Sequence, residues 1–302
     1  MQDSSLLSPL VVGIDVGGTK THLRAVAGAD LIADRVRAST GWRPHDPVAA
    51  ADWLAALIAE ALPTGARPAA VAVGGHACET PRQCAWIMYA LQLHLDAPVL
   101  VVGDAELLVP AAGLEKGVGL VAGTGSVAVG RLPDGSPLQV GGWGAVLGDE
   151  GGAAGLVREA VRAVWAAHDR GEAPDALAEG LTTAFEVAEV PALGAALESA
   201  EDVSADWGSR APVVFAAAEA GSALARSVIT EGGRSLAGLV RRLAVRGAAV
   251  DDVVVAGGTI LSQPALYDAF VTALADSVPG ARPTRLTVPP VQGATALAHS
   301  LL

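Results

Sequence analysis

Short apolar runs that end in glycine give the chain its main pattern. Residues 10–16 are apolar and stop at Gly17-Gly18, which predicts a buried strand followed by a tight turn. Similar runs predict further strands at residues 23–27, 31–38, 69–73, 99–102, 118–122, 127–132, 137–140 and 253–256. Helices are predicted at residues 46–62, 81–95, 263–276, 292–301 and through most of 151–246, with breaks near Gly171, Pro191 and Trp207. Alternating strands and helices predict an α/β protein.

One unit of this pattern occurs twice. Residues 13–17 and 119–123 each lead into a turn of glycine with threonine or serine, and each turn returns as a second strand. Helical segments follow both units. The repetition predicts two related α/β domains, which we place at residues 1–115 and 116–302.

Composition and charge exclude several classes of protein. The chain has 302 residues, of which 51% are hydrophobic and 17% charged, so it can bury two cores and is not disordered. A net charge of −12 repels nucleic acid and anionic membranes, and no run is long enough for a membrane helix. Cys78 and Cys84 fit no zinc or disulfide framework, and the first residues do not resemble a signal peptide. We expect a cytoplasmic protein that binds neither nucleic acid nor membrane.

Two of the glycine turns have the residue types that bind phosphate. Glycines let backbone N–H groups approach phosphate oxygens, a threonine adds a hydroxyl, and a lysine adds a positive charge. The first turn comprises Gly17, Gly18, Thr19 and Lys20, and the second comprises Gly123, Thr124, Gly125 and Ser126. Asp15, at the end of the first strand, is placed to hold Mg²⁺ through water. Neither turn is a P-loop or a dinucleotide fingerprint, and an ordinary hairpin remains the alternative.

Three further segments carry candidate chemistry. Asp104 follows a buried strand and could accept the proton of an attacking hydroxyl, or it could only cap the helix that begins at Ala105. The glycine-rich segment 141–152 contains Asp149, which could bind two sugar hydroxyls, and Trp143, which could form an apolar wall. Gly257-Gly258 could pass beneath an adenine ring. The alternatives are a flexible connection and a plain strand-to-helix turn.

In this order and spacing the segments resemble the N-acetylglucosamine kinase family. That family belongs to the actin-like, sugar-kinase and Hsp70 ATPase superfamily, beside the BadF/BcrA-type ATPases. The most specific part is residues 123–126 followed, about twenty residues later, by Gly142-Trp143-Gly144 and residues 148–151. The resemblance covers residues 11–301 and implies two ribonuclease-H-like, actin-type ATPase domains with a nucleotide and sugar cleft between them.

The resemblance also implies an activity and a set of site residues. It implies a kinase that uses ATP and Mg²⁺ to phosphorylate N-acetylglucosamine at its 6-hydroxyl, with Asp104 as the catalytic base and, as in eukaryotic members, a homodimer. The implied ATP-binding residues are Gly17, Gly18, Thr19, Lys20, Gly123, Thr124, Gly125, Ala217, Gly257 and Gly258. The implied sugar-binding residues are Thr40, Gly41, Trp42, Asp104, Ser126, Gly142, Trp143, Gly144 and Asp149.

Departures from the family pattern leave other functions open. The sugar loop reads Ser39-Thr40-Gly41-Trp42 and lacks the family's asparagine, so the preferred sugar is not determined by the sequence. ROK sugar kinases share the Asp-x-Gly-Gly-Thr opening, but their Cys/His zinc cluster and their Glu-x-Gly-His motif are absent here. The alternatives are another hexose or glucosamine kinase, a BadF/BcrA-type ATPase that activates a partner through an iron–sulfur cluster, and a non-catalytic sugar sensor.

Overall fold

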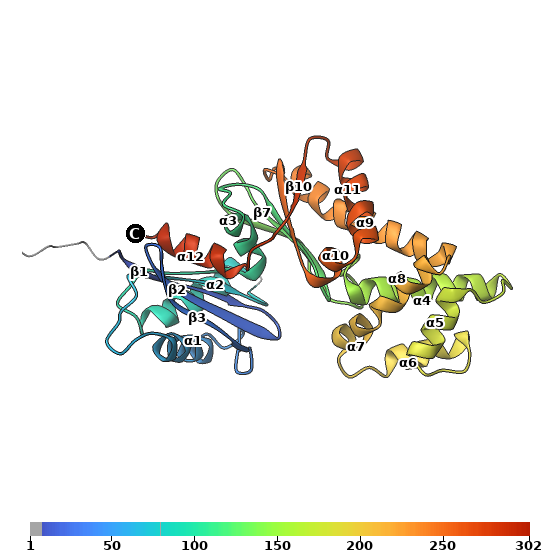
Figure 1. Ribbon diagram of the computed structural model, residues 1–302, viewed down its shortest axis with the longest axis horizontal. Coiled ribbons are helices and arrows are strands. Elements are labelled where there is room, and N and C mark those ends of the chain that lie inside the picture. The colour runs from blue at the N-terminus through green and yellow to red at the C-terminus, as the bar shows by residue number, and fades with distance from the viewer. Residues whose placement is uncertain (1–7, 79) are drawn as a thin grey trace, which may run out of the picture. The chain divides into compact units, whose positions relative to one another are not determined.

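The computed structural model describes residues 8–78 and 80–302, and the chain forms two compact units (Figure 1). The first unit extends to Lys116 and also contains Leu286–Leu302, and the second unit is Gly117–Arg285. The sequence predicts Leu286–Leu302, the last seventeen residues, as part of the second domain. They belong to the first unit because helix α12 (Val291–His299) packs on strand β1 (Leu10–Val16). A methyl group added to Gly13 would lie 2.4 Å from the backbone nitrogen of Thr295, so only glycine permits this contact.

The first unit is a five-stranded sheet covered by helices on both faces. Its strand order is β3-β2-β1-β4-β5, with β2 (Lys20–Ala27), β3 (Asp30–Ala38), β4 (Ala70–Gly75) and β5 (Val99–Gly103). β2 is antiparallel to β1 and β3, whereas β4 is parallel to β1 and β5. Helices α1 (Pro47–Ala61) and α2 (Pro81–Gln92) bury one face, and α12 packs on the other. A short 3-10 helix, η1 (Asp104–Leu107), and α3 (Leu108–Ala111) follow β5.

The two long helices of this unit begin where the sequence predicts. Asp46 caps α1 and accepts a hydrogen bond from the backbone nitrogen of Ala49 at 3.1 Å. Thr80 caps α2 in the same way, through its hydroxyl and the backbone nitrogen of Gln83 at 3.2 Å. A proline occupies the first helical position in both cases, where its missing N–H is not needed. Local capping signals therefore set where both helices begin.

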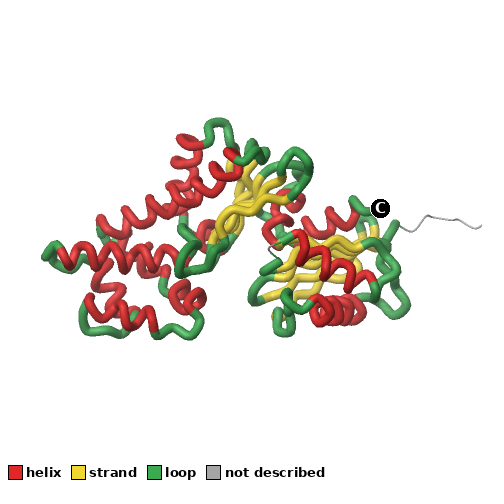
Figure 2. The backbone as a smooth tube through the Cα atoms, turned by 180° about the vertical axis from the view of Figure 1, so that it is seen from behind, coloured by secondary structure: helices red, strands yellow, loops and turns green. Residues whose placement is uncertain are grey.

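The second unit repeats the sheet of the first and adds more helices. Its order is β10-β9-β6-β7-β8, with β6 (Val118–Ala122), β7 (Ser126–Arg131), β8 (Pro137–Gly141), β9 (Asp252–Ala256) and β10 (Arg282–Arg285). Read from β8, this is the same order and the same mixture of parallel and antiparallel pairs as in the first unit. The repeated strand-turn-strand units of the sequence therefore correspond to two sheets of one topology (Figure 2).

Helices of the second unit fill the sequence between and after these strands. They are α4 (Ala153–Asp169), α5 (Ala176–Ala184), α6 (Leu193–Glu198), α7 (Val203–Ser209), α8 (Ala211–Glu219), α9 (Ala223–Val245), α10 (Gly258–Ser262) and α11 (Pro264–Ser277), with a 3-10 turn, η2 (Val190–Ala192), before α6.

One sequence expectation for this unit holds, and one strand was missed. The predicted break near Trp207 lies at Arg210, between α7 and α8, and the buried Trp207 indole of α7 donates to the Leu197 carbonyl at 3.1 Å. Strand β10 was not predicted, because its four residues are mostly exposed and two of them are arginines. Arg282 pairs with Asp252 at 2.8 Å across the edge of the sheet, which supports a strand that has little apolar surface.

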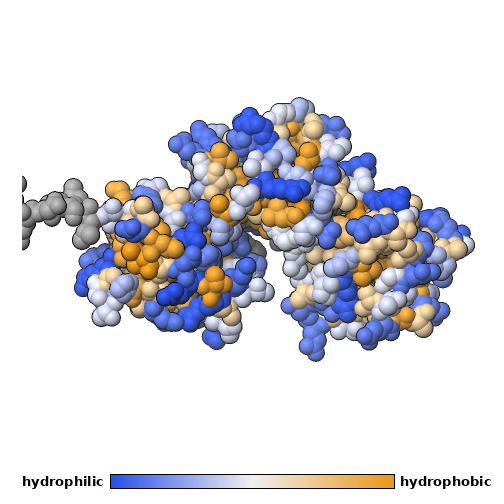
Figure 3. All heavy atoms as spheres, in the orientation of Figure 1, coloured by the Kyte–Doolittle hydropathy of each residue, from blue (hydrophilic) through white to orange (hydrophobic). Residues whose placement is uncertain are grey.

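The surface mixes polar and apolar residues. The face in Figure 3 shows hydrophilic residues interspersed with small hydrophobic patches. Over residues 8–78 and 80–302, no helix has the length and hydrophobicity needed to cross a membrane.

Candidate active site

The first glycine turn joins β1 to β2 and is held by the segment that follows β3. The Gly17 amide donates to the Lys20 carbonyl at 3.0 Å and closes the turn. The Ser39 hydroxyl donates to the Gly17 carbonyl at 2.7 Å, and the Ser39 amide donates to the Thr19 carbonyl at 3.0 Å. Gly18, Thr19 and Lys20 are exposed. The turn is thus fixed from behind while its outer surface is accessible to a ligand.

Two carboxylates lie at the same edge of the sheet as this turn. The parallel register pairs Val16 with Gly75 and Gly75 with Gly103, so the carboxyl ends of β1, β4 and β5 are level. Asp15 is one residue before the end of β1, and Asp104 directly follows β5. Burial, and then the negative charge of Asp104, raise the pKa of Asp15 to about 7, with Lys20 acting in the opposite direction. The structure therefore brings Asp15, Lys20 and Asp104 into one electrostatic neighbourhood.

The predicted sugar loop after β3 is partly used for packing. Thr40 is exposed, and Gly41 has a φ of +103° with the Trp53 ring against it. The Trp42 indole lies 5.9 Å from that of Trp53, and its Nε1 donates to the His76 carbonyl at 2.9 Å. Trp42 thus supports the chain that follows β4, a role that the sequence does not predict.

The second glycine turn joins β6 to β7 and is held from three sides. The Ala153 amide, at the start of α4, donates to the Gly123 carbonyl at 2.9 Å. The Thr259 hydroxyl donates to the same carbonyl at 2.8 Å. The Ser126 hydroxyl, predicted to contact sugar, donates to the Glu150 carbonyl at 2.8 Å. As in the first turn, the central threonine, Thr124, is exposed.

Asp149 connects the glycine-rich segment to this second turn. Its side chain is 7% exposed, and its φ of +56° is unusual for a residue other than glycine. A methyl group added to Gly125 would lie 2.5 Å from Asp149 Oδ2, so the carboxylate packs directly on the turn. Burial raises the pKa of the Asp149 carboxyl, and backbone groups of Ser126 and Gly144 partly oppose this. Asp149, which is predicted to bind sugar hydroxyls, is buried beside Gly125.

Arg158, on α4, is a residue of this region that the sequence analysis missed. Its Nη1 donates to the carbonyls of Ala145 and Gly148, the latter at 2.7 Å, and its Nε pairs with Glu159 at 2.9 Å. The guanidinium thus fixes the glycine-rich segment, in which the Trp143 residue is 74% exposed. An arginine on an amphipathic helix gives no sequence signal for this role, because its partners are backbone carbonyls.

Of the predicted adenosine residues, only Gly258 has open space beside it. Gly257 has a φ of +110°, and a methyl group there would lie 2.4 Å from the backbone of Ala122. A methyl group on Gly258 meets nothing within 4 Å. Ala217 is 4% exposed and lies in the core of the second unit, so its methyl is not presented to a ligand.

These glycines give a matched pair of variants. We expect Gly257→Ala to lower the free energy of unfolding by about 2–6 kcal/mol, because it adds both strain and a backbone clash. Gly258→Ala should keep wild-type stability and raise the KM for ATP about tenfold if an adenine ring occupies the open space. Chemical denaturation and initial-rate kinetics measure the two effects. An unchanged KM for ATP in Gly258→Ala would remove this residue from the nucleotide site.

Comparison with known proteins identifies the family. The sequence pattern of the BadF/BadG/BcrA/BcrD ATPase family matches residues 12–298. The chain belongs to this family. Among curated proteins, the N-acetylmuramic acid/N-acetylglucosamine kinase of Clostridium acetobutylicum is 29% identical over 171 residues, 54% of this chain. The match covers 56% of the relative, so this chain spans about half the length of the curated protein it resembles.

Solved structures show the same fold. A candidate N-acetylglucosamine kinase from Chromobacterium violaceum has a TM-score of 0.71 at 22% identity, covering 96% of this chain and 99% of that one. The ROK hexokinase of Thermus thermophilus has a TM-score of 0.61 at 19% identity, with 96% and 98% covered. A ROK glucokinase from Streptomyces griseus, solved with glucose and AMPPNP, has a TM-score of 0.55 at 15% identity, with 97% and 99% covered. The predicted α/β fold with two related sheets is confirmed.

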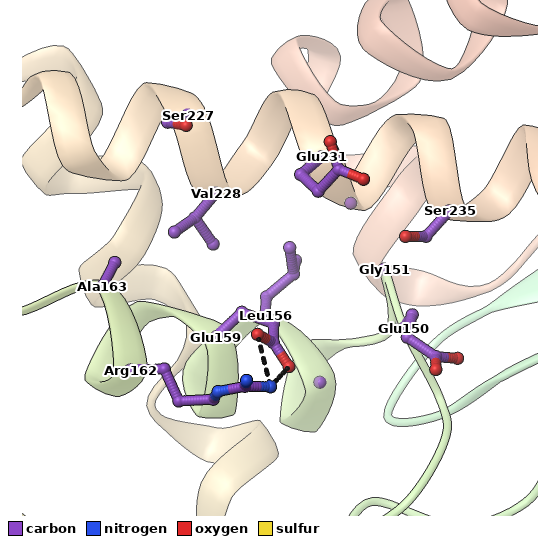
Figure 4. Close-up of a pocket in the computed structure, with 12 residues that line it drawn as sticks. Glu150, Gly151, Leu156, Glu159, Arg162, Ala163, Ser227, Val228, Glu231 and Ser235 are labelled. Atoms are coloured by element: carbon purple, nitrogen blue, oxygen red, sulfur yellow. Dashed lines mark hydrogen bonds and ion pairs between the residues drawn. The ribbon is translucent and has the colours of Figure 1, made fainter. Parts of the chain in front are cut away.

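The second unit of this protein has a groove beside the glycine-rich segment 141–152. It has a volume of about 520 Å³, and Leu156 from α4 and Val228 from α9 point into it (Figure 4). Arg162 pairs with Glu159 at 3.2 Å on its wall. Glu150 borders the groove, but none of the residues predicted to bind ATP or sugar lines it.

Proposed function

We propose that this protein is an ATP-dependent kinase that transfers the γ-phosphoryl group of ATP to an amino sugar. The proposed substrate is N-acetylglucosamine and the product N-acetylglucosamine 6-phosphate. The family match and the name of the Clostridium relative support this reaction. The same reasoning supports the proposal that the two glycine turns bind phosphate groups of ATP.

The observation that carries the proposal is the position of Asp104. Its side chain is 36% exposed at the edge of the sheet, beside the first glycine turn. Its Oδ1 accepts a hydrogen bond from the Ala105 amide at 2.8 Å, which fixes the carboxylate and leaves lone pairs for a hydroxyl. A carboxylate held in this way can orient the sugar hydroxyl and take its proton while the oxygen attacks the γ-phosphorus. Positioning and charge stabilisation are what phosphoryl transfer requires.

The residues around Asp15 fit a magnesium ion that arrives with the nucleotide. Asp15 and Asp104 are close enough to repel each other, and Lys20 is the positive charge that acts on Asp15, so this excess of negative charge favours a cation. Among the described residues, no group of three or more His, Cys, Asp or Glu side chains could hold a metal alone. Mg²⁺ does not need such a group, because it keeps several waters and shares phosphate oxygens. Asp15 would hold the ion through water, and the bound ion would neutralise charge on the phosphates.

Other sugars are the second candidate substrates. Gly41 stands where the family's sugar loop carries asparagine, and the Clostridium relative is also named for N-acetylmuramic acid. A coupled ADP-release assay with N-acetylglucosamine, N-acetylmuramic acid, glucosamine, N-acetylmannosamine and glucose tests the proposal. We expect the highest kcat/KM with an N-acetylated amino sugar. Sugar-independent ADP release throughout the panel would refute a sugar kinase.

We also propose a homodimer, which follows from the resemblance, and a cytoplasmic location, which is the expectation from the sequence. Light scattering on the purified protein tests the homodimer. A cluster-binding ATPase would need accessible cysteines, whereas Cys78 and Cys84 are both buried. Absorbance near 400 nm in a freshly purified sample would nevertheless favour that alternative.

A further inference from the structure

His76 lies between the first glycine turn and Asp104, and neither the family resemblance nor the sequence pattern assigns it a role. It directly follows β4, the strand between β1 and β5. Its Nδ1 lies 3.5 Å from Asp104 Oδ2. On the other side of the ring, a methyl group added to Gly18 would lie 3.5 Å from His76 Nε2. The imidazole thus reaches from the proposed base to the proposed phosphate turn.

The backbone of His76 is fixed from both sides. Its amide donates to the Val16 carbonyl at 2.7 Å, and its carbonyl accepts from Trp42 Nε1 at 2.9 Å. The next residue, Ala77, has a φ of +60°, a left-handed conformation that costs free energy for a residue with a side chain. Backbone strain of this kind is often found at functional positions.

We infer that His76 is a positioning residue for Asp104 in the phosphoryl transfer, an inference that rests on the proposed kinase function. Asp104 Oδ1 accepts a hydrogen bond from the Ala105 amide, and Oδ2 lies 3.5 Å from His76 Nδ1, which is placed to hold it. With both oxygens anchored, the carboxylate presents its remaining lone pairs in one direction. The sugar hydroxyl gives its proton to Asp104, while His76 neither gains nor loses one. We expect the 3.5 Å separation to shorten when substrate binds, because catalytic hydrogen bonds are often long in ligand-free enzymes.

Asparagine and glutamine variants separate the two ring nitrogens. The amide of His76→Asn places a donor close to the position of Nδ1, whereas the longer His76→Gln places it close to that of Nε2. We expect His76→Ala and His76→Gln to lower kcat about 10- to 100-fold, the scale of a misplaced catalytic group, with the KM for ATP within twofold of wild type. His76→Asn should retain kcat within about threefold. Thermal unfolding of each variant shows whether it is folded.

A double-mutant cycle with Asp104→Asn tests whether His76 acts through Asp104. If it does, His76→Ala should change the residual kcat of Asp104→Asn less than twofold, because the group it positions is already absent. Full activity of folded His76→Ala, equal losses in the Asn and Gln variants, or an additive double mutant would each overturn the inference. If wild-type protein releases no ADP with any sugar, the proposed function fails and the inference fails with it. Wild-type activity with an active His76→Ala refutes only the role of His76.

Discussion

Asp104→Asn is expected to turn over sugar at least about 1,000-fold more slowly than wild type and to bind ATP with unchanged affinity. Loss of the proton acceptor and loss of hydroxyl positioning together reach this scale. Asparagine keeps the oxygen that accepts from the Ala105 amide, so the start of η1 should remain intact. Coupled ADP release measures turnover, and calorimetry with a non-hydrolysable ATP analogue measures binding.

The matched control for this variant is Asp30→Asn, which removes the same charge from an exposed position of the first unit. We expect it to retain wild-type turnover, which would exclude a general effect of net charge. Asp104→Asn with near-normal kcat would remove Asp104 from the mechanism. Loss of ATP binding in a folded Asp104→Asn would instead assign the carboxylate to the nucleotide.

Much of the fold could be predicted because its signals are local. Apolar runs that end in glycine turns mark the strands of both sheets, and Asp46 and Thr80 each precede a proline at a helix start. The repeat of residues 13–17 at 119–123 predicted two related sheets, which share one strand order. The return of α12 to the first unit could not be predicted, because the contact that decides it joins Gly13 to Thr295 across almost the whole chain.

The positions of the two glycine turns and of Asp104 could be predicted from the sequence, but the side-chain contacts between separate segments could not. Glycines at strand ends located both turns, and a carboxylate after a buried strand located Asp104. His76 was missed because a single histidine forms no motif, and its approach to Asp104 arises only from the register of β4 and β5. The burial of Asp149 was missed for a similar reason, since Gly125 packs against it from a separate segment.

Asp15→Asn is expected to change how stability depends on pH. The pKa of Asp15 is about 7 in the folded protein, against 3.8 for an unperturbed aspartate, so folding favours the protonated carboxyl. This contribution to stability is full below about pH 4 and is lost as the pH rises through 7. Asparagine stays neutral at every pH. Without Mg²⁺ and nucleotide, the variant should match wild type near pH 4 and exceed it by about 2–4 kcal/mol at pH 8.5.

Denaturation of wild type, Asp15→Asn and Asp30→Asn across this pH range measures the effect. Parallel curves for wild type and Asp15→Asn would show that the carboxylate ionises without cost in the folded protein. The neighbouring charge provides a second check. Asp104→Asn removes a repulsive partner, so the pKa of Asp15 in the folded protein should fall, and the loss of stability with rising pH should be smaller and end at lower pH than in wild type.

The same variant separates a structural carboxylate from one that serves the nucleotide. If Asp15 holds the magnesium ion through water, Asp15→Asn should raise the half-saturating Mg²⁺ concentration tenfold or more and lower kcat about 100-fold, despite its greater stability at pH 8.5. Greater stability with lower activity is the result expected when a buried charge destabilises the folded protein but is needed for its function. A stabilised Asp15→Asn with wild-type Mg²⁺ dependence would instead make Asp15 a buried acid with no part in the reaction.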